Sequence, residues 1–410
     1  MSRDEIVHWK TQAWQDPKMV SWYAGRMQEE RHTNRLKNEI EVGLCQRHAV
    51  GPEVLDVGIG TGRASLPLAR AGLRVTGIDS SQAMLEECAR QAGDLPITLQ
   101  LGDVAHLEFP DGCFDSLVSL NVLVHFPHWR EVLREWARVV RKGGRIIFDI
   151  HSLDHERVAS AAYGLPPPEE DLSPDCYTCR ITADELLETA DALELAILAV
   201  TPYGGVLGAG NRNLWLHDSL ASGHRFERLL SWVAVDERLY AFARFLELEV
   251  FAQLTPTATG RMLVVFEKRP AAAENHAWRA RMQALDAWLA SSPLTYADAF
   301  SRIPAWDEGW RARLNDHMAW PRNRVLMHFL LSNFPGRIEL VSFFDPPWAA
   351  TLQDWQRRYL MDIATQRLLR RFVTDSAWSD LDACGVNLRA GLEYELTRDL
   401  LNHCLKAFDA

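Results

Sequence analysis

The clearest evidence for the fold is the sequence "EVLDVGIGTGR", from Glu53 to Arg63. A short apolar run passes through Asp56, and Gly58, Gly60 and Gly62 then follow at every second position. Glycine at such a turn lets the backbone bend sharply and approach a ligand closely, because it has no Cβ. The spacing also differs from the G-x-G-x-x-G pattern of dinucleotide-binding enzymes. The stretch therefore predicts a strand, a glycine-rich ligand loop and a helix in succession.

Strand-like and helix-like runs alternate from residue 53 to residue 150. The strand-like runs are "EVLDVG", "RVTGID", "ITLQLGD", "FDSLVSL" and "RIIFDI". The helix-like run "WREVLREWARVVRKGG" ends in Gly143-Gly144, which predicts a helix stop. Two later runs, "LELAILAV" and "GRMLVVFEKR", add strands to the sheet. We therefore expect an α/β fold with a seven-stranded, mostly parallel sheet that carries helices on both faces.

Polar residues follow three of these predicted strands. Asp79 ends "RVTGID", about 20 residues past the glycines, where a carboxylate can accept hydrogen bonds from both hydroxyls of a ribose. Gly102-Asp103-Val104 follows the third strand, and its carboxylate could accept from the amino group of an adenine. The fourth strand ends near Asn121, at the edge where open parallel sheets bind ligands.

The run from Glu53 to Ile150 resembles the class I S-adenosylmethionine-dependent methyltransferases, including the ubiquinone-biosynthesis and small-molecule enzymes. The similar stretches are "EVLDVGIGTGR", "GIDSSQAMLEECAR", "LGDVAHLEFPDGCFDSLVSLNVLVHF" and "EWARVVRKGGRIIFDI". The resemblance implies a Rossmann-like fold, S-adenosylmethionine as the cofactor and S-adenosylhomocysteine as the product. It covers residues 53–150 closely and residues 1–274 loosely.

The resemblance also implies which residues hold the cofactor. They are, from the methionine part through the ribose and adenine to the sulfonium, Asp56, Gly58, Gly60, Thr61, Gly62, Asp79, Ser80, Met84, Gly102, Asp103, Val104 and Asn121. Tyr23 and Arg26 lie on an N-terminal helix that related enzymes use to close the site, with the arginine over the cofactor carboxylate. An ordinary surface helix is an equally good interpretation of these last two residues.

Three histidines are candidates for a catalytic base. A hydroxyl acceptor usually needs a base, and histidine suits that role near neutral pH. His125 and His128 follow the fourth strand, and His151 follows the fifth. His125 is the preferred base because it lies four residues after Asn121. The alternative for each histidine is a structural hydrogen bond to a neighbouring loop.

The chain divides into two expected domains. Residues 1–274 would form the methyltransferase domain, with an N-terminal helical lid over 1–50 and lid-like insertions over 151–180 and 201–255. The stretch "PAAAENHA", from residue 270 to 277, reads as a linker to a mainly helical accessory domain at 275–410. That domain is rich in tryptophan, through which a homo-oligomer could form. Its "FFDPPW" resembles a motif of adenine methyltransferases, but without a second glycine fingerprint we expect a turn.

The amino-acid composition limits the classes of partner that we expect the protein to bind. The net charge is -11, and neither domain has the basic surplus of a protein that grips nucleic acid. No apolar run is long enough to span a membrane, and the seven cysteines suggest a reducing cytoplasm. The lone C-x-x-C pair at Cys176 and Cys179 has no further ligands at matching spacing, so no metal is expected.

The expected function is S-adenosylmethionine-dependent methyl transfer to an oxygen or nitrogen atom. The acceptor would be a small molecule, a sugar or glycan, or a biosynthetic intermediate. One alternative is a tRNA or DNA methyltransferase, which would bind nucleic acid in a salt-sensitive way. The other is a non-catalytic scaffold protein with a vestigial cofactor fold, which would show no turnover.

Overall fold

The computed structural model describes residues 2–28, 32–162, 177–204 and 259–290, with isolated positions between 166 and 173 and between 240 and 257. The chain forms two compact units. The first comprises residues 1–160, 166–201 and 259–283, and the second comprises 161–165, 202–258 and 284–410. All residues of the candidate site lie in the first unit.

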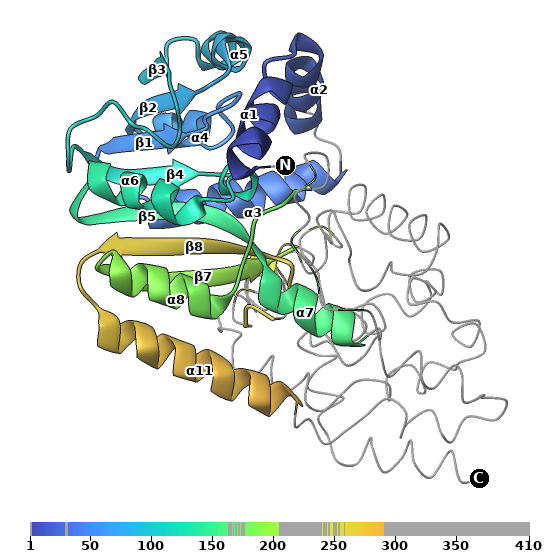
Figure 1. Cartoon of the computed structure of the whole chain (residues 1–410). Helices are drawn as coiled ribbons and strands as arrows, with labels where there is room; N and C mark the ends of the chain where they lie inside the picture. Colours follow the sequence, from blue (N-terminus) through green and yellow to red (C-terminus); the bar gives the residue numbers. More distant parts are fainter. Residues whose placement is uncertain are drawn as a thin grey trace, which may run out of the picture. The chain divides into compact units, whose positions relative to one another are not determined.

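A mostly parallel sheet forms the centre of the first unit (Figure 1). Its strand order is β3-β2-β1-β4-β5-β8-β7, and the short β6 pairs with β5. The strands are β1 (Glu53–Val57), β2 (Arg74–Asp79), β3 (Ile97–Leu101), β4 (Phe114–Ser119), β5 (Val140–Ser152), β6 (Arg180–Ile181), β7 (Leu195–Tyr203) and β8 (Arg261–Lys268). The pair β5 and β8 is antiparallel. The expected α/β sheet is therefore confirmed, with β6 as an additional strand.

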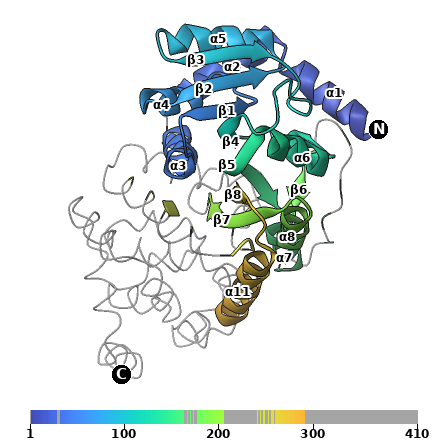
Figure 2. The same ribbon diagram turned by 90° about the vertical axis from the view of Figure 1, so that its left-hand side faces the viewer.

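Helices cover both faces of the sheet, as expected. Figure 2 shows α3 and α4 on one side of the strands and α6 and α8 on the other. The helices are α1 (Arg3–Ala13), α2 (Pro17–Gln28), α3 (His32–His48), α4 (Ser65–Arg70), α5 (Gln82–Ala92), the short η1 (Leu123–His125), α6 (Trp129–Val139), α7 (Leu153–Ala162), α8 (Ala183–Ala192) and α11 (Ala272–Ala290). In the described part of the chain, none of them has the length and apolarity to cross a bilayer.

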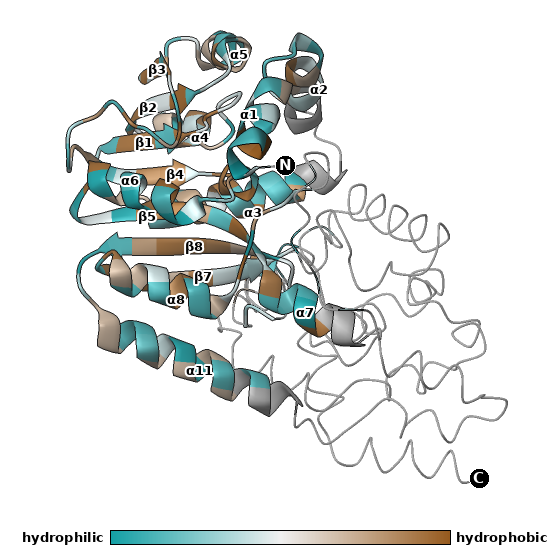
Figure 3. Cartoon of the chain, in the orientation of Figure 1, coloured by the Kyte–Doolittle hydropathy of each residue, from teal (hydrophilic) through white to brown (hydrophobic). Residues whose placement is uncertain are grey.

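The core lies between the central strands and α6. Trp136 of α6 is fully buried, and its indole N–H donates to the Val104 carbonyl at 2.9 Å. Its ring packs edge-on against Phe148 of β5, which in turn packs against Phe266 of β8. Figure 3 shows the apolar colour concentrated on β4 and β8. Each fully buried apolar side chain contributes about 1.5–3 kcal/mol, so this aromatic row fixes the centre of the sheet.

The predicted helix stop at Gly143-Gly144 is wrong. Helix α6 ends earlier, at Val139, and both glycines lie inside β5. A Cβ on Gly144 would lie only 2.6 Å from the carbonyl oxygen of Asp115, so glycine is required for close approach of two strands. The same residue type that ends helices therefore serves here inside a strand.

One expectation for the connecting segments also needs correction. Within the expected lid-like insertion at 151–180, β5 continues to Ser152 and α7 follows it. The expected linker at 270–277 is the start of α11, which buries Trp278 and bonds the Asn275 amide to the Leu195 carbonyl at 2.8 Å. Cys176, "FFDPPW", nearly all of the 201–255 insertion and the accessory domain beyond residue 290 lie outside the described residues.

Candidate active site

The glycine loop joins β1 to α4. Gly58, Gly60 and Gly62 have φ angles of 72°, 54° and 85°, in the left-handed region that favours glycine. A Cβ on Gly58 would lie 2.3 Å from Val122 Cγ2, so packing against the protein itself requires that glycine. The nearest atom to a Cβ on Gly60 would be Tyr23 Cε1, at 3.8 Å. The backbone at Gly60 is therefore open to a ligand.

Asp79 ties the end of β2 to this loop. Its Oδ2 accepts a hydrogen bond from the Gly60 N–H at 2.8 Å, and its Oδ1 accepts from the Ser81 N–H at 2.9 Å. Burial raises the pKa of Asp79, while these backbone hydrogen bonds oppose the rise. A carboxylate has about four lone-pair positions, so acceptor capacity remains for a ligand.

Asp56 lies beneath the glycine loop and is more deeply buried than Asp79. Its Oδ2 accepts a hydrogen bond from the Ser65 hydroxyl at 2.6 Å. Burial, with a contribution from the nearby Asp79, raises the pKa of Asp56 to about 7. Thr61 is buried in the loop, and Met84 is buried with its N–H donated to the Ser81 hydroxyl at 3.3 Å. Ser80, between Asp79 and Ser81, is half-buried.

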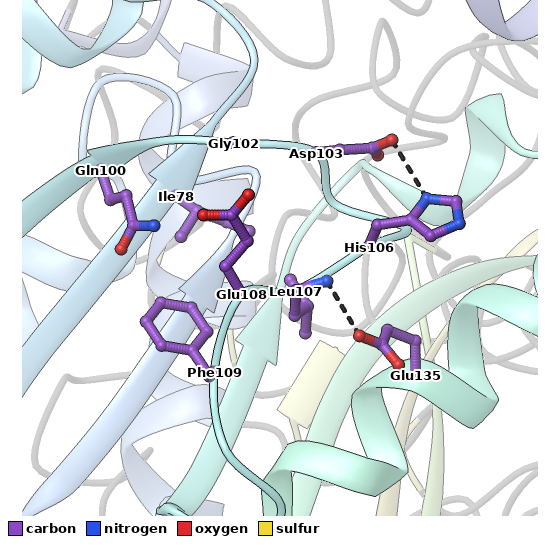
Figure 4. A pocket seen from close by; sticks show the side chains of 9 residues that line it. All are labelled: Ile78, Gln100, Gly102, Asp103, His106, Leu107, Glu108, Phe109 and Glu135. Atoms are coloured by element: carbon purple, nitrogen blue, oxygen red, sulfur yellow. Dashed lines mark hydrogen bonds and ion pairs between the residues drawn. The ribbon is translucent and has the colours of Figure 1, made fainter.

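The segment after β3 borders a cavity. The Gly102 N–H donates to the Asp79 carbonyl at 3.0 Å, and Val104 is buried. The Asp103 carboxylate is largely exposed and interacts with the His106 ring at 3.3 Å (Figure 4). The cavity beside it has a volume of about 390 Å³. It is lined by Ile78, Gln100, Gly102, Asp103, His106, Leu107, Glu108, Phe109 and Glu135.

Asp103, which is expected beside the adenine, lies at the border of this cavity. Ile78 lines it, and Ile78 precedes Asp79 directly in β2. Consecutive strand residues point to opposite faces of a sheet. The cavity therefore opens on the face opposite the Asp79 carboxylate.

The N-terminal helices bring one of the two expected lid residues to the loop. Tyr23 of α2 faces Gly60, and its ring packs edge-on against Trp14, with the centroids 5.5 Å apart. Burial raises the pKa of Tyr23. Arg26 lies in α2 as well, but its side chain is outside the described residues. The Trp14 ring also lies 6.3 Å from the His125 ring, which links the helices to the end of β4.

The structure separates the three candidate histidines. His125 Nδ1 and His151 Nε2 are buried, and neither has a hydrogen-bond partner among the described residues. Burial lowers the pKa of His125 to about 4 and lowers the pKa of His151 well below its usual value, to which Arg261 also contributes. Both rings are therefore neutral at pH 7. His128 instead packs edge-on against Phe126 at the start of α6.

A cluster of charged and polar side chains surrounds the end of β4, and Asn121 is the one member that the sequence-based prediction contains. We call it the rim cluster, and its members are Lys37, Glu41, Arg63, Asn121, Asp149 and Arg261. Glu41 and Asp149 are fully buried. Glu41 pairs with the Arg63 guanidinium, and its Oε1 lies 3.7 Å from Lys37 Nζ. Arg261 Nη1 lies 3.6 Å from Asp149 Oδ2.

Strand register explains why these residues meet. His151 of β5 pairs directly with Arg261 of β8, and Asp149 lies two residues earlier. All three side chains therefore emerge on one face of the sheet. Helix α3 packs against the same two strands and supplies Lys37 and Glu41, one turn apart. The sequence predicts Asn121 as a site residue, and the one local signal for the other members is Asp149, a charged residue inside the apolar run "RIIFDI".

Asn121 lies at the centre of the rim cluster. Its φ is 60°, and its backbone N–H donates to Asp149 Oδ1. Its side-chain oxygen accepts from Arg261 Nη1 at 2.8 Å and from Lys37 Nζ at 3.4 Å. Both neighbours can only donate, so the amide oxygen must face them. The amide Nδ2 is buried and has no hydrogen-bond partner among the described residues.

Comparison with known proteins shows that the chain is similar to methyltransferases. A family model described as a methyltransferase domain matches residues 55–148. A phosphatidylethanolamine N-methyltransferase of Cereibacter sphaeroides is 37% identical over 151 residues, which cover 35% of this chain and 74% of that protein. The O-methyltransferase resE of Aspergillus sclerotiorum is 34% identical over 141 residues, 31% of this chain. The chain spans about half the length of this second relative (53%).

Solved structures include a possible histamine N-methyltransferase from Thermotoga maritima. It is 16% identical with a TM-score of 0.40, and the match covers 62% of this chain and 98% of that one. The sequence relatives and the family model carry the assignment. The chain belongs to the class I S-adenosylmethionine-dependent methyltransferases, and S-adenosylmethionine is its cofactor.

Proposed function

We propose that the enzyme transfers a methyl group to an oxygen or nitrogen atom of a small-molecule acceptor. This class includes sugars or glycans and biosynthetic intermediates. The observation that carries the proposal is the hydrogen-bonded unit of Gly60 and Asp79, which presents an open glycine backbone beside a buried carboxylate. The names of two relatives, an N-methyltransferase and an O-methyltransferase, fit both acceptor atoms. Membership of an enzyme family sets aside the vestigial-scaffold alternative.

The residues around the loop fit S-adenosylmethionine, which supplies an electrophilic methyl group on its sulfonium. The Gly58–Gly62 loop and Asp56 would hold the methionine part, and Asp79 would accept hydrogen bonds from the ribose hydroxyls. Asp103 and Val104 would border the adenine. Tyr23, facing Gly60, would cover the cofactor and exclude water. Asn121, at the end of β4, would lie under the sulfonium.

The protein's contribution to transfer would be positioning and desolvation, which can lower the barrier of a two-reactant step by about 7–11 kcal/mol. A base role for His125 stays a prediction. With a pKa of about 4, its neutral ring can accept a hydrogen bond at pH 7 but is a weak base. The site therefore suits an amine that is already neutral, or an oxygen that ionises readily, better than an aliphatic alcohol.

Binding of S-adenosylhomocysteine to Asp79→Asn tests the cofactor assignment. We expect the wild type to bind tightly in isothermal titration calorimetry and the variant to bind about tenfold more weakly, because an amide loses one ribose acceptor. Asp94→Asn makes the same chemical change in an exposed turn and should bind like the wild type. Unchanged affinity in Asp79→Asn would contradict the ribose role.

A further inference from the structure

Two donors of the rim cluster are little used among the described residues, because Asn121 Nδ2 has no hydrogen-bond partner and Lys37 Nζ makes one long hydrogen bond. We propose that Lys37 and Asn121, the latter held in place by Arg261, form a binding site for a carboxylate-type oxyanion of the acceptor, so that the acceptor is an anionic small molecule. This inference rests on the proposed function and names the substrate class for it. It is carried by the geometry of Asn121 and by the burial and charge of Lys37.

Asn121 supplies a fixed donor. Arg261 and Lys37 both donate to its Oδ1, which prevents the amide from turning over. The backbone N–H bond to Asp149 holds the residue in its left-handed conformation. The Nδ2 group can therefore only donate, and a buried donor without a partner costs free energy. An acceptor oxygen at this point would remove that cost.

Lys37 supplies a second donor and a charge. Its side chain is 12% exposed, and its ammonium group has three N–H donors. Among the described residues it makes one long hydrogen bond, 3.4 Å to Asn121, while Glu41 at 3.7 Å is beyond hydrogen-bond distance. Burial lowers the pKa of Lys37 to about 8, although Glu41 opposes this. The neighbouring carboxylates therefore do not fully stabilise the ammonium, and an added anion would.

The charges in the rim cluster also favour an anionic acceptor. Within the described rim cluster, Lys37, Arg63 and Arg261 stand against Glu41 and Asp149. The other nearby carboxylates face the cofactor loop, because Asp79 accepts from two backbone amides and Asp56 accepts from Ser65. A carboxylate at this point would pair with the Lys37 ammonium, whereas a protonated amine would meet it as a like charge.

Ligand binding to the protein saturated with S-adenosylhomocysteine tests the proposal. The probes are benzoate, benzyl alcohol and benzylamine, titrated by calorimetry at pH 7 and low salt. We expect benzoate to bind about tenfold more tightly than either of the others. Equal binding of the three, or no binding of benzoate, would overturn the proposal.

Two variants locate the benzoate site. Asn121→Asp keeps the shape and tolerates the positive φ but replaces the Nδ2 donor with an anion, and Lys37→Met removes the ammonium. Each should weaken benzoate about tenfold. Lys142→Met, at an exposed lysine of β5, is the matched control and should bind like the wild type. If both rim variants fold and bind benzoate normally, the proposal is wrong.

A second comparison separates the acceptor from the cofactor as the source of the carboxylate. S-adenosylhomocysteine carries a carboxylate, and 5′-methylthioadenosine lacks it. If the rim residues serve the acceptor, the two variants should change the affinities for both compounds alike. A selective loss of S-adenosylhomocysteine affinity would assign the site to the cofactor and overturn the proposal. Failure of the wild type to bind S-adenosylhomocysteine would instead contradict the proposed function.

Discussion

The two halves of the candidate site are built in opposite ways. In the cofactor half, between β1 and β2, backbone N–H groups donate most of the hydrogen bonds. Gly60 and Ser81 donate their N–H groups to Asp79, and Gly58 and Ile59 donate to the Ile78 carbonyl at 2.9 Å. In the rim cluster, side chains from α3, the glycine loop, β4, β5 and β8 meet through charge.

The cofactor half is therefore preformed, whereas the rim cluster is completed only when a ligand binds. Hydrogen bonds within the loop leave the cofactor half largely satisfied before any ligand binds. The rim cluster keeps Asn121 Nδ2 and Asp149 Oδ2 buried without hydrogen bonds among the described residues. Buried groups in this state lower stability, so they persist where binding selects them. Four substitutions test this contrast.

The largest effect is expected in the rim cluster from Glu41→Gln. The change keeps the side-chain shape but removes the negative charge that faces Arg63, Lys37 and Arg261. Removing one partner of a buried ion pair costs about 3–5 kcal/mol. Urea unfolding should show this loss, while Glu188→Gln, at an exposed position of α8, should change stability by less than about 0.5 kcal/mol. Similar losses in both variants would show that the charge of Glu41 contributes no more to stability than the charge of an exposed glutamate.

The next effect concerns acid stability and His125. Its pKa is about 4 in the folded protein, below the usual 6.5, so the unfolded chain binds a proton first as pH falls. Stability from the neutral ring is complete above pH 6.5 and is lost as pH falls toward 4, by about 3 kcal/mol in total. In His125→Gln this loss should be absent, as unfolding curves at several pH values would reveal. Parallel pH dependences would show that His125 is not buried in a neutral form.

The same contrast explains what the sequence could predict. The glycine loop and Asp79 are dictated by local backbone geometry, so their residue types and spacing indicate the cofactor half directly. The rim cluster depends on the β5–β8 register and on the packing of α3, which bring residues 37, 63, 149 and 261 together. No local sequence pattern indicates that these residues lie close together. The predicted helix stop at Gly143-Gly144 is wrong because glycine occurs both at helix ends and at close contacts between strands.

A smaller effect on stability, with a clear effect on binding, is expected from Gly60→Ala. Both Gly60 and Gly72 have positive φ, and a Cβ on Gly72 would meet nothing within 4 Å. Each alanine substitution should therefore cost about 1–2 kcal/mol of backbone strain. Only Gly60→Ala should weaken S-adenosylhomocysteine binding, because its methyl group fills the open side of the loop. Equal affinities in the two variants would show that the ligand does not approach Gly60.

The smallest effect on stability is expected from Lys37→Met, because the pKa of Lys37, lowered to about 8, shows that its burial already penalises the ammonium. Replacing it with an apolar chain of similar length removes that penalty along with the attraction to Glu41, which keeps Arg63 as a partner. The two changes oppose each other, so unfolding free energy should shift by less than about 1 kcal/mol at pH 7. A loss as large as that of Glu41→Gln would mean that Lys37 is a structural ion-pair partner. A near-neutral result, with weakened benzoate binding, would mean that the lysine is kept for the acceptor.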